Sequence, residues 1–165
     1  MVRSPWSADA LDEARVRHFL ETTGVAGATV DVVIDEVSEV KQRRDSVGTM
    51  RQYLGCVGKT ANGEVTVTLH GLVGAYDLPL CGHLYLPEEW AADAERRKQS
   101  RVPDDVVFQT KLELAHGLLE RVAGWGLTIG RVFGDPGRAV EKSHSGLEDP
   151  FQDGIRMQSG LGRGA

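Results

Sequence analysis

Long hydrophobic runs, cysteine and a leader segment are scarce or missing in this sequence. No stretch of its 165 residues approaches the run of about 20 apolar residues that a membrane-spanning helix needs. Residues 1–6 contain one arginine with no apolar segment behind it, which does not fit a secretory signal. The two cysteines, Cys56 and Cys81, fall in expected strands; their spacing allows a disulfide, but buried free thiols fit a chain without an export signal better. These absences predict a cytoplasmic protein.

Positive charge is also in short supply. The formal net charge is -5 at pH 7, which argues against a surface that grips nucleic acid all over, because phosphate neutralisation needs clustered Lys and Arg. Basic residues gather between Lys41 and Lys59, against the single acid Asp45. This segment is either a solvated loop or a local contact to a DNA backbone. The candidate DNA-binding residues are Lys41, Arg43, Arg44 and Arg51.

Two common kinds of site lack their signatures. Gly134 and Gly137 follow an expected strand, but no phosphate-loop lysine and no Gly-x-Gly-x-x-Gly pattern accompany them, so nucleotide binding has little support. His70, His83 and His116 are scattered and show no metal-ligand spacing with the cysteines. The sequence therefore does not predict a zinc site.

The spacing of apolar residues predicts alternating strands and helices. A turn is expected at residues 61–63, because Asn-Gly supplies the positive φ angles of tight hairpins, and a polar loop is expected over 38–46. Thr110 and Glu113 form a capping box at the start of a helix. Helices are predicted over 7–22, 88–97 and from 110 to about 123, and strands over 29–35, 51–57, 64–72, 80–86 and 127–133.

This order of elements is typical of an α/β or α+β fold with a mixed sheet and a crossing helix. Three segments are predicted. Residues 1–28 form an N-terminal helical segment, residues 29–135 form the folded domain, and residues 136–165 form an irregular or disordered tail rich in glycine.

Two acids stand at the ends of predicted apolar strands. Asp35 follows Val32-Val33-Ile34, and Asp135 follows Val132-Phe133-Gly134. If the strands are neighbours, the two carboxylates are placed to share divalent metal ions, as in enzymes that transfer phosphoryl groups. Acids also commonly end strands as turn residues. Tyr53 and Trp90 are open to two interpretations as well, as platforms for stacking bases or as core residues.

Several linked segments resemble insertion-sequence transposases of the IS701 and IS4-like group within the DDE superfamily. The similar segments follow the family's order over roughly residues 30 to 135. They are Val33–Glu36, Val40-Lys41, Ser46–Gly48, Arg51–Gly55, Leu84–Trp90, Arg96-Arg97, Val102–Phe108, Thr110–Ala115 (where Leu112 replaces the family's proline) and Val132–Asp135.

The resemblance implies a partial RNase H-like fold whose acidic triad binds Mg²⁺ or Mn²⁺, hydrolyses a phosphodiester and joins the freed end to target DNA. Asp35 matches the first triad aspartate and Asp135 the second, as catalytic residues and metal ligands. The match stops at Pro136, where the family usually continues toward a Tyr-Gly pair. Glu141 and Glu148 lie too close to Asp135 to match the family's third acid, a glutamate on a later helix.

Three hypotheses follow from the missing C-terminal catalytic part. The chain is an inactive truncated transposase, produced by a frameshift or an early stop near codon 136. Alternatively, it is a non-catalytic DNA-binding or regulatory partner of a full-length transposase, bound to the insertion-sequence ends. The third hypothesis is a split enzyme, in which a complementary polypeptide supplies the glutamate.

Overall fold

The computed structural model describes residues 7–42 and 45–134 of the chain. Nowhere in these two ranges is a helix both long and apolar enough to cross a membrane. The elements, in chain order, are α1 (Ala8–Thr22), β1 (Thr29–Val40), β2 (Met50–Leu54), β3 (Lys59–Val73), β4 (Tyr76–Leu84), α2 (Glu88–Ala92), α3 (Ala94–Gln99), α4 (Lys111–Gly124) and β5 (Thr128–Gly134).

The strands form the mixed sheet that the sequence predicts. Their order is β2-β3-β1-β5, and β4 pairs with β3. β1 and β5 are parallel, whereas β2 and β3 are antiparallel. A parallel pair needs a crossover connection, and α4 precedes β5 in the chain. The mixed α/β architecture is therefore confirmed, and it is consistent with part of an RNase H-like fold.

The helix ends form where local side chains predict them. The Ser7 side chain accepts a hydrogen bond from the Ala10 N–H at the start of α1. At α4, the Thr110 N–H donates to the Glu113 carboxylate (2.7 Å) and the Glu113 N–H donates to the Thr110 hydroxyl (3.2 Å). The Thr110 hydroxyl also donates to the Glu113 carboxylate (2.8 Å). The hydrogen bonds from the Thr110 N–H and hydroxyl lower the pKa of Glu113. Gly126, at φ 78°, lies just beyond the end of α4.

The chain divides into two compact units, and β1, β3, β4 and α4 each contribute residues to both. Of the described residues, unit 1 comprises 7–35, 69–81 and 119–134, and unit 2 comprises 36–42, 45–68 and 82–118. The predicted boundaries at residues 28 and 135 stay predictions. The buried apolar residues of unit 1 include Val16, Leu20, Val30, Val32, Leu69, Val73, Leu80, Leu119, Val122 and Val132; those of unit 2 include Leu54, Val65, Val67, Leu86, Trp90, Leu114 and Leu118.

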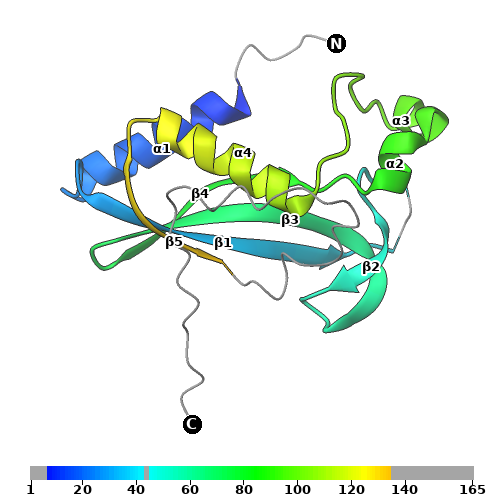
Figure 1. The fold of residues 1–165 in the computed structure, drawn as a ribbon, viewed down its shortest axis with the longest axis horizontal. Helices are drawn as coiled ribbons and strands as arrows, with labels where there is room; N and C mark the ends of the chain where they lie inside the picture. The colour runs from blue at the N-terminus through cyan, green and yellow to red at the C-terminus, as the bar shows by residue number, and fades with distance from the viewer. Residues whose placement is uncertain (1–6, 43–44, 135–165) are drawn as a thin grey trace, which may run out of the picture. The chain divides into compact units, whose positions relative to one another are not determined.

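In unit 1, α1 and the C-terminal part of α4 lie on one face of the strands (Figure 1). Arg15 of α1 donates to the carbonyl oxygens of Pro79 (2.7 Å) and Leu80 (2.8 Å) on β4. Arg121 of α4 forms an ion pair with Asp9 of α1 at 2.9 Å. These polar contacts join the two helices and a strand at the edges of the apolar core, so the helix positions do not depend on apolar burial alone.

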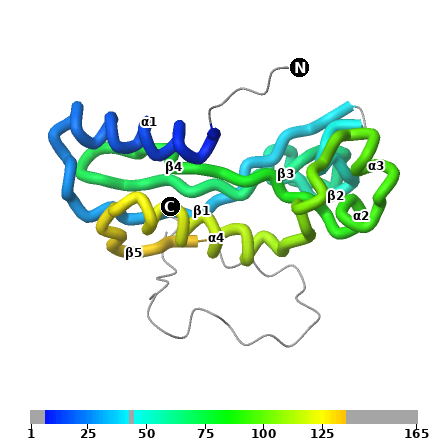
Figure 2. Tube along the Cα trace, turned by 90° about the horizontal axis from the view of Figure 1, so that it is seen from above, coloured from blue at the N-terminus to red at the C-terminus, as the bar shows by residue number. Residues whose placement is uncertain are grey.

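In unit 2, the short helices α2 and α3 lie beside β2 (Figures 1 and 2). Trp90 is 0% exposed, and its indole N–H donates to the Thr49 carbonyl oxygen at 2.8 Å. The Arg96 guanidinium lies 3.8 Å from the centroid of the Trp90 ring and also donates to the Thr49 carbonyl oxygen at 3.2 Å. One tryptophan therefore joins α2, α3 and the segment before β2.

Arg97 of α3 holds the loop that leads to α4. Its guanidinium donates to four carbonyl oxygens, those of Ala91 (3.1 Å), Pro103 (2.9 Å), Asp104 (3.4 Å) and Val106 (2.7 Å). This loop contains a turn at residues 104–105. The side chain thus replaces the hydrogen bonds that a regular element would give this segment.

The predicted turn at residues 61–63 is wrong. Asn62 and Gly63 lie within β3, where they pair with Arg51 and Met50 of β2. The turn lies instead at residues 55–58, where the Gly58 N–H donates to the Leu54 carbonyl oxygen at 3.0 Å. Gly58 has a φ of 63°, so it supplies the left-handed conformation that was expected from Asn62-Gly63.

Other boundaries differ from the predictions as well. β1 continues to Val40, through the first part of the expected polar loop, and β4 starts at Tyr76 rather than Leu80. The helix expected over 88–97 is two helices, because the Asp93 side chain accepts from the Arg96 N–H (2.9 Å) and caps a second helix. Tyr53, for which a core position was one of two interpretations, is 52% exposed on β2.

The two cysteines are both free, and they differ in environment. Cys56 lies in the exposed turn over residues 55–58, not in a strand. Cys81 is buried on β4, and this burial raises the pKa of its thiol to about 11. Cys81 is therefore a core residue that stays protonated at neutral pH.

Candidate active site

Asp35, the first predicted catalytic acid, lies inside a strand rather than at its end. β1 runs from Thr29 to Val40, and Asp35 is exposed there. Residues 29–34 bury their side chains more fully than residues 35–40 do. The sequence suggested a strand end because the apolar run stops at Ile34, but the main chain continues as a strand past this change in polarity.

The strand that precedes Asp135, the second predicted acid, is the direct neighbour of β1. β5 pairs with β1 in parallel, and Ile34 lies opposite Gly134. Gly134 is the last residue of β5, and Asp135 lies outside the described residues. The condition on which the sequence argument depended, that these two strands are neighbours, is therefore met.

A bulge interrupts the pairing of β1 and β5. Val30 pairs with Ile129 and Val32 with Val132, so one residue of β1, Asp31, faces two residues of β5. One of these two is Gly130. A Cβ atom at Gly130 would lie 2.5 Å from the Asp31 carboxylate and 2.6 Å from the Thr29 methyl group, closer than real contacts allow. Any larger residue at this position would therefore require the side chains of Asp31 and Thr29 to move.

The other bulge residue, Arg131, binds Asp31 with both its main chain and its side chain. Its N–H donates to Asp31 Oδ1 at 2.8 Å, and its Nε and Nη2 donate to Oδ2 at 3.0 and 2.6 Å. We call this group, Asp31, Gly130 and Arg131, the bulge clasp. The Arg131 side chain, and then its main-chain N–H, hold the pKa of Asp31 below its ordinary value.

The lowered pKa of Asp31 predicts a stability contribution that depends on pH. A carboxyl group with a folded-state pKa below its unfolded value stabilises the protein above about pH 4, and this contribution is lost as the pH falls through the folded-state pKa. We expect Asp31→Asn to be less stable than the wild type at pH 6 and to approach it in stability at pH 3. Urea denaturation across this range measures the difference.

The control for this prediction is Asp104→Asn, at an exposed turn position. Its stability difference from the wild type is expected to stay constant over the same pH range. A difference between the wild type and Asp31→Asn that does not shrink with falling pH would contradict the assignment.

The predicted DNA-binding residues have different environments. The Lys41 ammonium forms ion pairs with Glu39 (2.8 Å) and Glu64 (3.0 Å), and these hydrogen bonds raise its pKa. Arg51 lies on β2 and is exposed. Arg43 and Arg44 lie outside the described residues. The structure therefore engages the ammonium of Lys41 with two carboxylates, and it leaves the side chain of Arg51 on the surface.

The structure also joins two residues from separate family-like segments to which the sequence analysis gave no role. The Lys111 ammonium at the start of α4 donates to the Glu36 carboxylate on β1 at 2.8 Å, and both side chains are mostly buried, at 25% and 19% exposed. Lys111 also lies 5.5 Å from the centroid of the Tyr85 ring. No local pattern could have shown this pair, because the partners are 75 residues apart.

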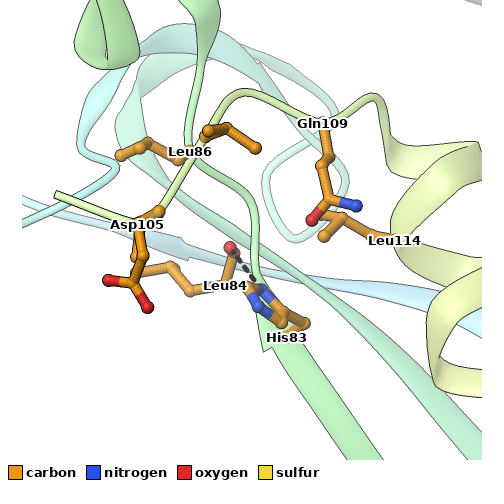
Figure 3. A pocket seen from close by; sticks show the side chains of 8 residues that line it. His83, Leu84, Leu86, Asp105, Gln109 and Leu114 are labelled. Carbon is orange, nitrogen blue, oxygen red and sulfur yellow. Dashed lines mark hydrogen bonds between the residues drawn. The ribbon is translucent and has the colours of Figure 1, made fainter. Parts of the chain in front are cut away.

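A cavity of about 180 Å³ lies in unit 2 (Figure 3), and among the described residues neither Asp35, Lys41 nor Arg51 lines it. Its wall is mostly leucine and valine, with the polar side chains of His83, Asp105 and Gln109. His83 Nδ1 lies 3.0 Å from the Leu84 carbonyl oxygen. Across the described ranges 7–42 and 45–134, no three His, Cys, Asp or Glu side chains group closely enough to hold a metal ion.

Comparison with known proteins identifies the family. Residues 2–139 match the family described as DDE superfamily endonuclease. The chain is also 27% identical over 135 residues to the "Probable transposase for insertion sequence element IS701" of Microchaete diplosiphon. That alignment covers 82% of this chain and 32% of the relative, so the chain spans about a third of the relative's length. No solved structure matches the chain.

The family match extends over most of the sequence, and it includes the β1 and β5 strands that border the two predicted acids. The strand pairing and the mixed sheet agree with it. The chain belongs to the DDE superfamily of endonucleases, and it is related to an insertion-sequence transposase.

Proposed function

We propose that this chain forms the front part of a DNA transposase catalytic core and supplies two of its three metal-binding acids, Asp35 and Asp135. One observation supports this more than any other: β1 and β5 are adjacent and parallel, with Ile34 opposite Gly134. In the sequence, Asp35 directly follows Ile34, and Asp135 directly follows Gly134. If the pairing continues by one residue, the two carboxylates come level on neighbouring strands.

Two carboxylates at this position fit a divalent metal in their chemistry. Mg²⁺ and Mn²⁺ prefer hard oxygen ligands, and the exposed position of Asp35 leaves room for a nucleic acid to approach. A bound metal pair would neutralise charge and act as a Lewis acid during in-line displacement at phosphorus. The described strands contribute a paired sheet: β1 carries Asp35, and β5 ends at Gly134, one residue before Asp135.

We propose DNA as the substrate, with the basic segment around β2 as the part that contacts its phosphates. Arg51, Arg43 and Arg44 are the residues most suited to this, and Lys41 belongs to the same stretch. Because two carboxylates already surround the Lys41 ammonium, we assign Lys41 a smaller share of the contact than Arg51. Phosphate contacts of this kind position the DNA without reading its sequence.

We further propose that the 165-residue chain, taken by itself, does not cleave DNA. None of the acids after Asp135 in this sequence follows the family's pattern for the third ligand. Two carboxylates leave a metal pair poorly positioned, and small misplacements cost orders of magnitude in rate. Metal binding and cleavage are therefore expected to separate in this chain.

The experiment that tests the proposed site is a titration of the 165-residue chain with Mn²⁺ alone. Binding is measured by calorimetry or by the paramagnetic resonance signal of free Mn²⁺. We expect weak binding that falls by about tenfold or more in Asp35→Asn and in Asp135→Asn, since the loss of an outer-shell partner alone costs 10- to 100-fold in metal affinity. Asp104→Asn is the matched control and is expected to bind as the wild type does. Equal binding by Asp35→Asn and the wild type would refute the site.

A further inference from the structure

β5 can pair with β1 in two ways that differ by one residue. In the structure, the bulge absorbs one residue of β5, and Ile34 therefore lies opposite Gly134. If pairing continued one to one from Val30 and Ile129, Gly134 would lie opposite Asp35 instead. A slip of one residue also turns every later side chain to the other face of the sheet.

Apolar burial alone does not choose strongly between these two pairings. In the observed pairing Val132, which is 2% exposed, shares its face with Val32. In the shifted pairing Val132 would turn outward and Phe133 would turn toward the core. Both residues are apolar, so either one can fill the core face of β5.

Arg131 distinguishes the two pairings by its charge. In the shifted pairing it would lie opposite Val32, which is 0% exposed, and a guanidinium there would lose its hydration. In the observed pairing the Arg131 side chain is 64% exposed and makes two hydrogen bonds to the Asp31 carboxylate. Gly130 favours this arrangement, because a larger residue would displace the Asp31 side chain from its present position.

We propose that Arg131 is a positioning residue that selects the register of β5, with Asp31 as its acceptor and Gly130 as the hinge of the bulge. The functional consequence rests on the proposed function. The selected register places Gly134, the residue before Asp135, opposite Ile34, the residue before Asp35. The shifted register would place Gly134 opposite Asp35 itself, and a slip by one residue turns the later side chains of the strand to the opposite face.

Disulfide trapping in the full chain tests this proposal directly. The natural thiols are first removed as Cys56→Ser and Cys81→Ala, and Gly134→Cys is then combined with either Ile34→Cys or Asp35→Cys. The Ile34/Gly134 pair reports the observed register, and the Asp35/Gly134 pair reports the shifted one. Disulfides need Cα atoms within about 7 Å and converging Cβ vectors, so the observed register should favour the first pair on the order of tenfold in rate.

Arg131→Val is the decisive variant, because it removes the clasp and lets the shifted pairing bury an apolar side chain. We expect the preference to reverse toward the Asp35/Gly134 pair. Arg131→Lys keeps a charge that resists burial, and it is expected to restore the Ile34/Gly134 pair. A further variant combines Arg131→Val with deletion of Gly130, which removes the extra residue of the bulge. One-to-one pairing then places Ile34 opposite Gly134, so this variant should crosslink through the Ile34/Gly134 pair and show that the sheet still folds.

Two results would overturn the proposal. The first is a preference of the Arg131→Val variant for the Ile34/Gly134 crosslink, since the register would then not depend on the arginine. The second is the same crosslinking preference in the Arg131→Val and Arg131→Lys variants. The Mn²⁺ titration is independent of these outcomes. If the crosslinks form as expected but Asp35→Asn does not change Mn²⁺ binding, the proposed function is refuted and the proposal on register selection is not.

Discussion

The purified 165-residue chain is expected to leave a supercoiled plasmid uncut in Mg²⁺ or Mn²⁺, at protein concentrations where it binds metal. In-line displacement at a phosphodiester needs both the attacking and the leaving oxygen to be stabilised, usually by two metals about 3.5–4 Å apart. The two acids proposed here supply part of such a site, and a misplaced metal forfeits rate by factors of 100 or more. The conversion of supercoiled to nicked plasmid on an agarose gel is the measurement.

The same assay includes two variants for comparison. If the wild-type chain and Asp104→Asn nick the plasmid and Asp35→Asn does not, this chain holds a complete site. A cut that survives Asp35→Asn would instead indicate a contaminating nuclease. The addition of a second polypeptide, made from the part of the IS701 relative outside the matched third, tests whether a third acid supplied from outside restores cleavage.

Trp90→Ala is expected to lower the free energy of unfolding by about 3–5 kcal/mol, the range for a fully buried aromatic residue. The indole fills the core of unit 2, donates to the Thr49 carbonyl oxygen, and supports the Arg96 guanidinium at 3.8 Å. Removing it therefore creates a cavity and leaves a buried carbonyl with one donor fewer. Urea denaturation followed by circular dichroism measures the loss.

Trp90→Phe separates the two contributions. The phenyl ring keeps most of the packing and a surface for Arg96 but has no N–H, so we expect a cost of about 1–3 kcal/mol, the scale of a buried polar group that loses its partner. If the alanine variant were no less stable than the phenylalanine variant, the tryptophan would not be a packing centre.

Features that depend on neighbouring residues were predictable from the sequence. The helix that was predicted from residue 7 and the Thr110–Glu113 capping box each need only a few consecutive residues, and both form as expected. The strand that precedes Asp135 was also found, because its apolar run is flanked by glycine. These elements fix the α/β class and the order of the strands along the chain.

Features set by distant partners were not predictable. Asn62-Gly63 has the sequence of a turn, but Asn62 donates to the Lys41 carbonyl oxygen (2.7 Å), and its own carbonyl accepts from the Lys41 N–H (3.0 Å), so the two residues are held in a strand. Asp31 and Arg131 are 100 residues apart, and nothing in either segment alone announces a bulge. The candidate site shares this limit: Asp35 and Asp135 remain predictions from the sequence, and the register of β1 and β5 depends on contacts that only the folded sheet provides.

Some of the arginine side chains are already engaged within the protein. The Arg97 guanidinium donates to four carbonyl oxygens, and the Arg15 guanidinium donates to two carbonyl oxygens and to the Asp12 carboxylate. Such side chains count among the 19 Lys and Arg residues of the composition, yet their hydrogen-bonding edges already face the protein. Release of counterions from DNA scales with the phosphates that a protein neutralises. For the proposed contact with DNA, the slope of log affinity against log salt concentration should therefore be set by a small subset of the basic residues, and the bulk composition would overestimate this slope.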